Sequence, residues 1–129
     1  MIIADSDVLI DYLRGGNPRA EQVAFELQHG ALGTTAITAF ELEAGARSER
    51  QRVVTQDLLA ALQILPLGRE AARRGGVIWR QLTASGQQIG MADCMIAAIC
   101  IEHDQLLFTR NRRHFERIEG LRFSAGSVG

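Results

Sequence analysis

Short apolar runs typical of buried strands alternate along this chain with segments of helical periodicity, and this alternation restricts the possible folds more than any other feature. Strands are predicted at residues 1–5, 31–35, 64–67 and 106–109, with a weak fifth at 121–124. Helices are predicted at residues 8–14, 17–30, 38–48, 54–62, 71–82 and 92–102. This order predicts an α/β fold in a single domain of residues 1–129, with a mostly parallel, four- to five-stranded sheet and helices on both faces.

Local signals predict where several of these segments begin or lie. Asp7 is predicted to cap the helix after the first strand, and Asn17 followed by Pro18 is typical of the start of the next helix. Pro66 has no N–H to donate, which predicts that the third strand lies at an edge of the sheet. The segment 92–102 is almost wholly apolar, so we expect this helix to be buried.

The composition excludes several classes of protein. No apolar run approaches the roughly 20 residues of a membrane span, and residues 1–5 lack the basic start of a signal peptide. Cys94 and Cys100 are separated by about 240° around a predicted helix, which indicates two free thiols and not a pair. We therefore expect a cytoplasmic protein with no membrane association.

The basic residues are unusual because all 14 are arginine, in a chain whose net charge is −1. The arginines of the last 20 residues are Arg110, Arg112, Arg113, Arg117 and Arg122. A near-neutral chain with such a local patch is able to bind phosphates there without coating nucleic acid as a polycation does. The alternative for Arg110, Arg112 and Arg113 is a solvated turn in which they pair with Glu116 and Glu119, and the sequence does not separate the two interpretations.

Three acidic residues from separate segments are candidates for one site. Asp5 follows the first strand, at the edge of a parallel sheet where ligands bind. Asp93 heads the most apolar helix, where a carboxylate is costly to desolvate unless it meets a cation. Glu41 follows Thr38 by three residues, a spacing that fits a structural capping box as well as a functional site.

If these acids converge, their mutual repulsion requires a cation. Oxygen ligands without a neighbouring histidine or cysteine suit a hard ion, Mg²⁺ or Mn²⁺. His29, His103 and His114 fall at predicted helix ends or turns, so we expect surface or capping roles for them and not metal ligation. The residues alone therefore favour a carboxylate-bound divalent ion.

Four motifs, in order and over nearly the whole chain, resemble those of PIN-domain proteins, specifically the VapC-type toxins of bacterial toxin–antitoxin modules. They are Ile3–Asp11, Thr38–Leu42 with Gly45, Gly90–Ala98 and Thr109–Phe115. The resemblance implies a single PIN-like nuclease domain over residues 1–129, with Mg²⁺-dependent endoribonuclease activity on RNA. It also implies a VapB-like antitoxin as partner, and a homodimer.

The resemblance also assigns roles to individual residues. The acids that fall on the family's catalytic and metal-binding positions are Asp5, Glu41 and Asp93. Ser6 falls on the Ser or Thr that steadies the first carboxylate. Thr109 and Asn111 belong to the supporting motif, and Asn111 stands where many members carry a fourth acid. The residues expected to hold RNA phosphates are Arg110, Arg112 and Arg113.

Three alternatives stand beside this family. Asp5-Ser6-Asp7 also matches the DxD of haloacid-dehalogenase-like phosphohydrolases, and acids after the first strand also occur in phospho-receiver domains. Both classes normally use a lysine, and this chain has none. The third alternative is a PIN-like domain that binds RNA or a partner with little catalysis, because Asn111 replaces the fourth acid.

Overall fold

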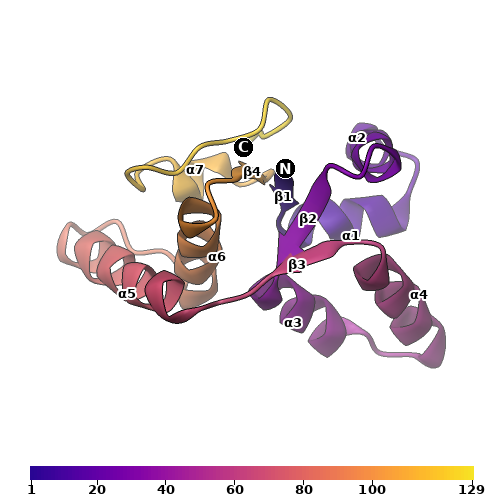
Figure 1. Ribbon diagram of the computed structural model, residues 1–129, viewed down its shortest axis with the longest axis horizontal. Coiled ribbons are helices and arrows are strands. Elements are labelled where there is room, and N and C mark those ends of the chain that lie inside the picture. Colours follow the sequence, from indigo (N-terminus) through magenta and orange to yellow (C-terminus); the bar gives the residue numbers. More distant parts are fainter.

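A four-stranded parallel sheet runs through the middle of the computed structural model, which describes residues 1–129 (Figure 1). The strand order is β3-β2-β1-β4, with β1 Ile2–Ala4, β2 Leu32–Thr35, β3 Gln63–Leu65 and β4 Leu106–Phe108. β3 lies at an edge, which confirms the prediction from Pro66. The fifth strand predicted at 121–124 is reduced to one bridge, between Phe123 and Leu107.

The strand β1 is central, with β2 on one side and β4 on the other. Ile2 pairs with Leu32 in β2 and with Leu106 in β4. The pairing of β2 with β3 depends on Gly33, because a Cβ at this position would lie 2.9 Å from the carbonyl oxygen of Gln63. All strands run the same way, so the residues that follow β1 and β4 meet at one edge of the sheet.

Seven helices cover the sheet, and their bounds are α1 Ser6–Arg14, α2 Pro18–Gln28, α3 Ala36–Gly45, α4 Glu49–Ala60, α5 Arg69–Ala84, α6 Met91–Glu102 and α7 Arg112–Phe115. The helices α5 and α6 lie on one side of the sheet in Figure 1, and α1, α2 and α4 lie on the other side. This confirms the predicted arrangement of helices on both faces.

Alternate strand residues point into two cores. Ile3 and Leu107 lie in the core with α5 and α6, whereas Ala4 and Phe108 lie in the core with α1 and α2. The apolar helix α6 is buried as predicted, with side chains packed on both the sheet and α5. Its buried residues are Cys94, Ile96, Ala97, Ala98, Ile99 and Cys100.

The predicted start of the first helix is wrong, and the error concerns an acid of the candidate site. β1 ends at Ala4, earlier than predicted, so α1 already begins at Ser6. Asp5 is therefore the cap, and its Oδ1 accepts a hydrogen bond from the N–H of Val8 at 3.2 Å. Asp7, the predicted cap, lies inside the first turn of α1, and its side chain is available for other contacts.

Of the two interpretations left open for the Thr38–Glu41 spacing, the structure contradicts the capping box. α3 begins two residues earlier, at Ala36, because the side chain of Thr35 caps it. The Oγ1 of Thr35 accepts a hydrogen bond from the N–H of Thr38 at 3.1 Å. Glu41 therefore lies in the second turn of α3, too far along the helix to cap it.

Other local predictions are largely confirmed. Asn17 caps α2 through a 2.9 Å hydrogen bond from the N–H of Ala20 to its Oδ1. Cys94 and Cys100 are free and buried. The predicted apolar stripe of α4 is confirmed only in part, because Leu58 is buried but Val54 is 42% exposed. No helix combines the length and apolar character that crossing a membrane requires.

Candidate active site

Asp5 is a buried carboxylate at the carboxyl end of the central strand. Its side chain is 6% exposed. Oδ1 accepts from the N–H of Val8, and Oδ2 accepts from the hydroxyl of Thr109. The pKa of Asp5 is raised to about 6: burial is the largest cause and the charges of Asp7 and Asp93 act in the same direction, whereas the two hydrogen bonds act in the opposite direction. A negative charge at Asp5 is therefore costly, and a nearby cation would favour it.

Thr109 is the residue that connects Asp5 to the rest of this edge. It follows β4 and is completely buried. Its Oγ1 donates to Asp5 and accepts from the N–H of Asn111 at 2.9 Å. Its backbone N–H donates to the hydroxyl oxygen of Ser127 at 3.1 Å, and its carbonyl accepts from the N–H of Val128 at 2.9 Å. Every polar atom of Thr109 is thus engaged, which fixes its hydroxyl toward Asp5.

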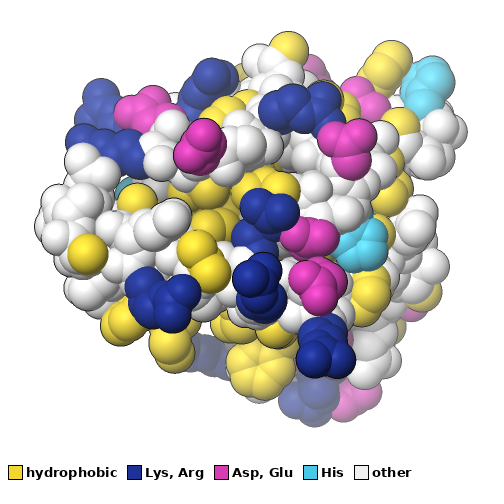
Figure 2. All heavy atoms as spheres, turned by 60° about the vertical axis from the view of Figure 1, so that its left-hand side comes forward, with side chains coloured by type: hydrophobic (Ala, Val, Ile, Leu, Met, Phe, Trp, Pro, Cys, Tyr) yellow, Lys and Arg dark blue, Asp and Glu magenta, His cyan; other side chains and the backbone are white.

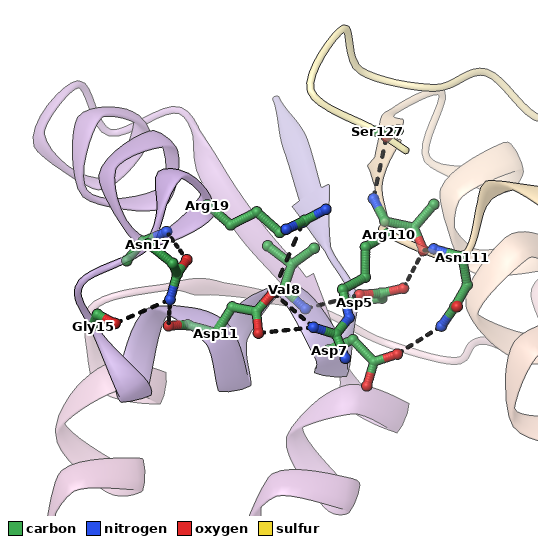
Figure 3. Close-up of polar contacts among 12 residues, drawn as sticks. Asp5, Asp7, Val8, Asp11, Gly15, Asn17, Arg19, Arg110, Asn111 and Ser127 are labelled. Atoms are coloured by element: carbon green, nitrogen blue, oxygen red, sulfur yellow. Dashed lines mark hydrogen bonds and ion pairs between the residues drawn. The ribbon is translucent and has the colours of Figure 1, made fainter. Parts of the chain in front are cut away.

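Asp7 belongs to the same site, although the sequence analysis placed it at a helix cap. The Nδ2 of Asn111 donates to Oδ2 of Asp7 at 2.6 Å (Figure 3). The charge of Asp7 raises the pKa of both Asp5 and Asp93, so the three acids belong to one electrostatic environment. The signal that was missed is the spacing of Asp5 and Asp7: once Asp5 caps the helix, Asp7 has no local structural role.

Asp93 lies in the first turn of α6, and its side chain is 32% exposed. The Nδ1 of His114, from α7, lies 3.4 Å from Oδ2 of Asp93. Burial raises the pKa of Asp93, the charge of Asp7 raises it further, and His114 lowers it. His114 is exposed at the surface, as expected, but its contact with a candidate acid was not predicted.

Glu41 reaches the site indirectly, through Ser6. The hydroxyl of Ser6 donates to Oε1 of Glu41 at 2.7 Å, and this links α1 to α3. Glu41 is exposed, and the carboxylate charges that raise the pKa of Asp5 and Asp93 do not include it. The structure therefore groups Asp5, Asp7 and Asp93 most closely and attaches Glu41 at one side.

The donor set fits a hard divalent cation. As they stand, no three carboxylate, imidazole or thiol side chains lie close enough to hold one metal ion together. The charges of Asp7 and Asp93 nevertheless raise the pKa of Asp5, and the charge of Asp7 raises that of Asp93, so an added positive charge would offset this repulsion. Carboxylates with the amide oxygen of Asn111 nearby are the oxygen donors that Mg²⁺ and Mn²⁺ prefer.

The three arginines of the last motif differ in their contacts. The Nη1 of Arg110 donates to both carboxylate oxygens of Asp11, at 2.9 and 3.1 Å. The guanidinium of Arg112 lies 4.6 Å from the ring centre of Phe123, a cation–π contact. Arg113 is exposed. None of the three pairs with Glu116 or Glu119, so the pairing considered as an alternative is absent, although Arg112 and Arg113 are exposed.

The surface charge is mixed and not strongly basic. On the face drawn in Figure 2, arginine side chains alternate with acidic and apolar ones and do not merge into one basic surface. A groove of about 650 Å³ lies elsewhere, between α1, α3 and α4, and Glu41 forms part of its wall. Its apolar lining includes Ile10, Leu13 and Val54. The groove thus opens beside the candidate site and not directly over Asp5.

These observations define a class of protein: an α/β domain with acidic side chains at the carboxyl edge of a parallel sheet. The PIN domain family model matches residues 2–121. The chain belongs to the PIN domain family, which confirms the resemblance seen in the sequence.

Known proteins similar to the chain over nearly its whole length carry VapC names. It is 35% identical to Ribonuclease VapC10 of Mycobacterium tuberculosis, covering 95% of this chain and 91% of that protein. It is 29% identical to the tRNA(fMet)-specific endonuclease VapC of Shigella flexneri, covering 92% of each. The crystal structure of DNA-bound VapBC from Salmonella typhimurium superposes with a TM-score of 0.85 and 28% identity, covering 95% of this chain and 96% of that one.

Proposed function

We propose that this protein is a metal-dependent endoribonuclease and the toxin of a VapBC-type toxin–antitoxin pair, acting in the cytoplasm. The observation that carries the proposal is the buried carboxylate of Asp5, facing the charges of Asp7 and Asp93 at the edge of the sheet. The names of the similar ribonucleases and endonucleases support the same reaction. In metal-dependent hydrolysis of a phosphodiester bond, carboxylates hold the cation, and a cation beside Asp5 would stabilise its buried charge.

We propose Mg²⁺ as the ion, with Mn²⁺ able to replace it, held by Asp5 and Asp93 with Glu41 and Asp7 close by. When bound, the ion would supply a water of lowered pKa and neutralise charge on the phosphate oxygens. The chain's own residues orient the donors. Thr109 and the N–H of Val8 hold the carboxylate of Asp5. The remaining acids are held by Asn111 on Asp7, His114 on Asp93 and Ser6 on Glu41.

RNA binding is assigned to the arginines that follow β4. Arg112 and Arg113 begin the short helix α7 and are exposed, so they are able to reach a phosphate beside the acids. Arg110 is held by Asp11, but only through Nη1, which leaves its Nε and Nη2 available. An acidic pocket repels RNA, so these cations are needed to keep the strand in place.

A VapB-like antitoxin is the partner that the similar complexes support. The groove between α1, α3 and α4 offers apolar side chains that end at Glu41. A segment of the antitoxin lying there would reach the edge of the acidic pocket. We also propose a homodimer, because Phe40 and Met91 are large apolar side chains that are 73% and 67% exposed.

A second candidate function is a PIN-like domain that binds RNA or a partner with little catalysis. It is favoured by the spacing of the acids, since no three of them already lie within reach of one ion. It is also favoured by Asn111, which supplies an amide and not a carboxylate to Asp7. The two functions make opposite predictions for cleavage in the presence of a metal ion.

The test is cleavage of RNA by the purified chain with Mg²⁺, with Mn²⁺ and with a chelator. We expect cleavage with either ion and none with the chelator. Asp93→Asn should abolish cleavage with an unchanged circular dichroism spectrum, whereas Asp57→Asn, an exposed carboxylate on α4, should leave it unchanged. Equal turnover by Asp93→Asn and the unaltered chain would refute the proposed site, and no cleavage with any ion would favour the binding domain.

A further inference from the structure

Asp11 is a buried carboxylate that lies between two arginines from distant parts of the chain. Its side chain is 8% exposed. Nη1 of Arg110 donates to both of its oxygens, and Nε of Arg19, from α2, lies 3.8 Å from its Oδ2. Figure 3 shows both guanidinium groups pointing to Asp11. Because arginine stays charged in proteins, this cluster carries one positive charge more than Asp11 neutralises.

Arg19 is the more loosely held arginine of this cluster, paired with Asp11 only through a 3.8 Å ion pair. Its guanidinium donates no hydrogen bond within the chain, and its Nε is buried without a partner. One arginine is sufficient to neutralise Asp11, and Arg110 already does so with two hydrogen bonds. A second arginine adds the cost of an unsatisfied buried donor. An anionic ligand on the outer nitrogens of Arg19 would give the second positive charge of the cluster a partner.

The cluster lies next to the acidic pocket. Asp7 and Asp11 are four residues apart on α1, so they share one face of the helix and are separated by about one turn, roughly 6 Å along its axis. In the view of Figure 3, the Asp7–Asn111 pair lies on the other side of Arg110 from Asp11. The positive cluster and the acids are thus neighbours along α1.

A phosphate is the anion that this geometry suits. Arg19 and Arg110 are 29% and 39% exposed at their side chains, so their outer nitrogens reach the surface. Guanidinium groups bind phosphate oxygens through paired hydrogen bonds, and Asp11 would hold both groups in one orientation. A separation of one helical turn is comparable to the distance between successive phosphates of a nucleic-acid strand.

We propose that Arg19 and Arg110, held in place by Asp11, bind one backbone phosphate of the RNA beside the bond that is cleaved. This inference rests on the proposed function for the identity of its ligand. The strand would then run from the acids along α1 toward the start of α2. The phosphate contact involves no base, so it would act on RNA of any sequence.

The test measures binding of a fluorescein-labelled, single-stranded RNA 12-mer by anisotropy at several salt concentrations. An Asp93→Asn background prevents cleavage. In that background we expect Arg19→Gln to weaken binding about fivefold at low salt and to reduce the slope of log Kd against log salt by about 0.7, as for one lost phosphate contact. Arg19→Lys should keep most of the slope. Arg80→Gln, an exposed arginine on α5, should change neither quantity.

A second arm identifies the phosphate itself. Replacing single phosphates of the 12-mer by neutral methylphosphonates should weaken binding at one position, and this loss should disappear in Arg19→Gln because the two changes remove the same contact. An unchanged slope in folded Arg19→Gln would overturn the inference, as would an equal loss in Arg80→Gln. Octaglutamate that binds as tightly as an RNA octamer, with the same dependence on Arg19, would indicate an acidic protein ligand and also overturn it. Binding is measured without cleavage, so a failure of the proposed nuclease activity is seen separately, in the metal-dependent assay.

Discussion

The hydroxyl of Thr109, after β4, donates a hydrogen bond to the carboxylate of Asp5, after β1, across 104 positions of sequence. This bond favours the ionised form of Asp5 and so opposes the effect of burial on its pKa. Thr109→Val preserves the shape of the side chain but removes the bond, which should raise the pKa of Asp5 above its present value of about 6. The acid limb of the pH–rate profile should then move to higher pH.

For Thr109→Val we expect a loss of activity of about tenfold at pH 6 and a smaller loss at pH 8, in line with the loss of roughly one charge-assisted hydrogen bond. The measurement is single-turnover cleavage from pH 5 to pH 9. Thr55→Val, at another buried threonine, is the matched control and should leave the profile in place. A uniform loss at every pH would contradict the assigned role of the hydroxyl.

Asp5 should make the metal-free protein less stable as the pH rises. The pKa of Asp5 is 3.8 in the unfolded chain and about 6 in the folded protein. The stability that the neutral carboxyl contributes to the fold is therefore fully present below pH 3.8 and is lost as the pH rises through 6. Asp5→Asn removes this penalty. In chelator at pH 7 we expect its free energy of unfolding to exceed that of the unaltered chain by about 1–3 kcal/mol, with the difference vanishing near pH 4.

Urea unfolding at a series of pH values measures this difference. Saturating Mg²⁺ should stabilise the unaltered chain at pH 7 and should have little effect on Asp5→Asn, because the ion compensates the buried charge. A free energy of unfolding for Asp5→Asn that is lower than that of the unaltered chain at every pH would show that Asp5 is structural.

Asn111→Asp tests whether this position limits metal binding. The substitution replaces the amide that donates to Asp7 by a second negative charge, so the metal-free protein should lose stability. The same charge should raise the affinity for Mn²⁺ by about tenfold, since affinity follows the number of charged ligands. Isothermal titration with Mn²⁺ gives the measurement. Asn111→Ala, which loses the hydrogen bond without adding charge, should not gain affinity.

Asp11→Ala should destabilise the fold because it leaves Arg110 and Arg19 without their carboxylate. Both arginines are partly exposed and are able to reach water, so the expected loss is about 1–3 kcal/mol and not the larger cost of a fully buried charge. Glu49→Ala, which breaks the exposed pair with Arg52, is the control and should change stability by less than about 1 kcal/mol. Equal effects of the two substitutions, measured by urea unfolding, would contradict the structural importance of Asp11.

Features that depend on neighbouring residues could be predicted from the sequence. The buried face of α5 follows from the spacing of Ala71, Gly75, Ile78 and Leu82, and all four are buried. The start of α2 follows from Asn17 and Pro18. The edge position of β3 agrees with the prediction, although Pro66 lies directly after the strand and not within it. In each case a physical preference of the residue acts over a few positions, so the pattern is visible in the chain itself.

Features that depend on tertiary contacts could not be predicted in the same way. The role of Asp7 depends on Asn111, 104 positions away, and the role of Asp11 depends on Arg110, 99 positions away. The prediction that Asp7 caps the first helix, while Asp5 belongs to the site, was wrong. Asp5 caps α1 and is also affected by the charges of the other acids. The weak strand at 121–124 failed because only Phe123 bridges to Leu107 before the chain turns to place Ser127 on Thr109.

The hydrogen bonds that Thr109 makes with Asp5 and Ser127 also bear on protein synthesis. During translation, Asp5 leaves the ribosome long before Thr109 and Ser127 do. Its carboxylate acquires this hydrogen-bonded arrangement only after both later residues have emerged. The candidate acidic site is therefore completed only after residues 109–127 have been synthesised, long after its first acid.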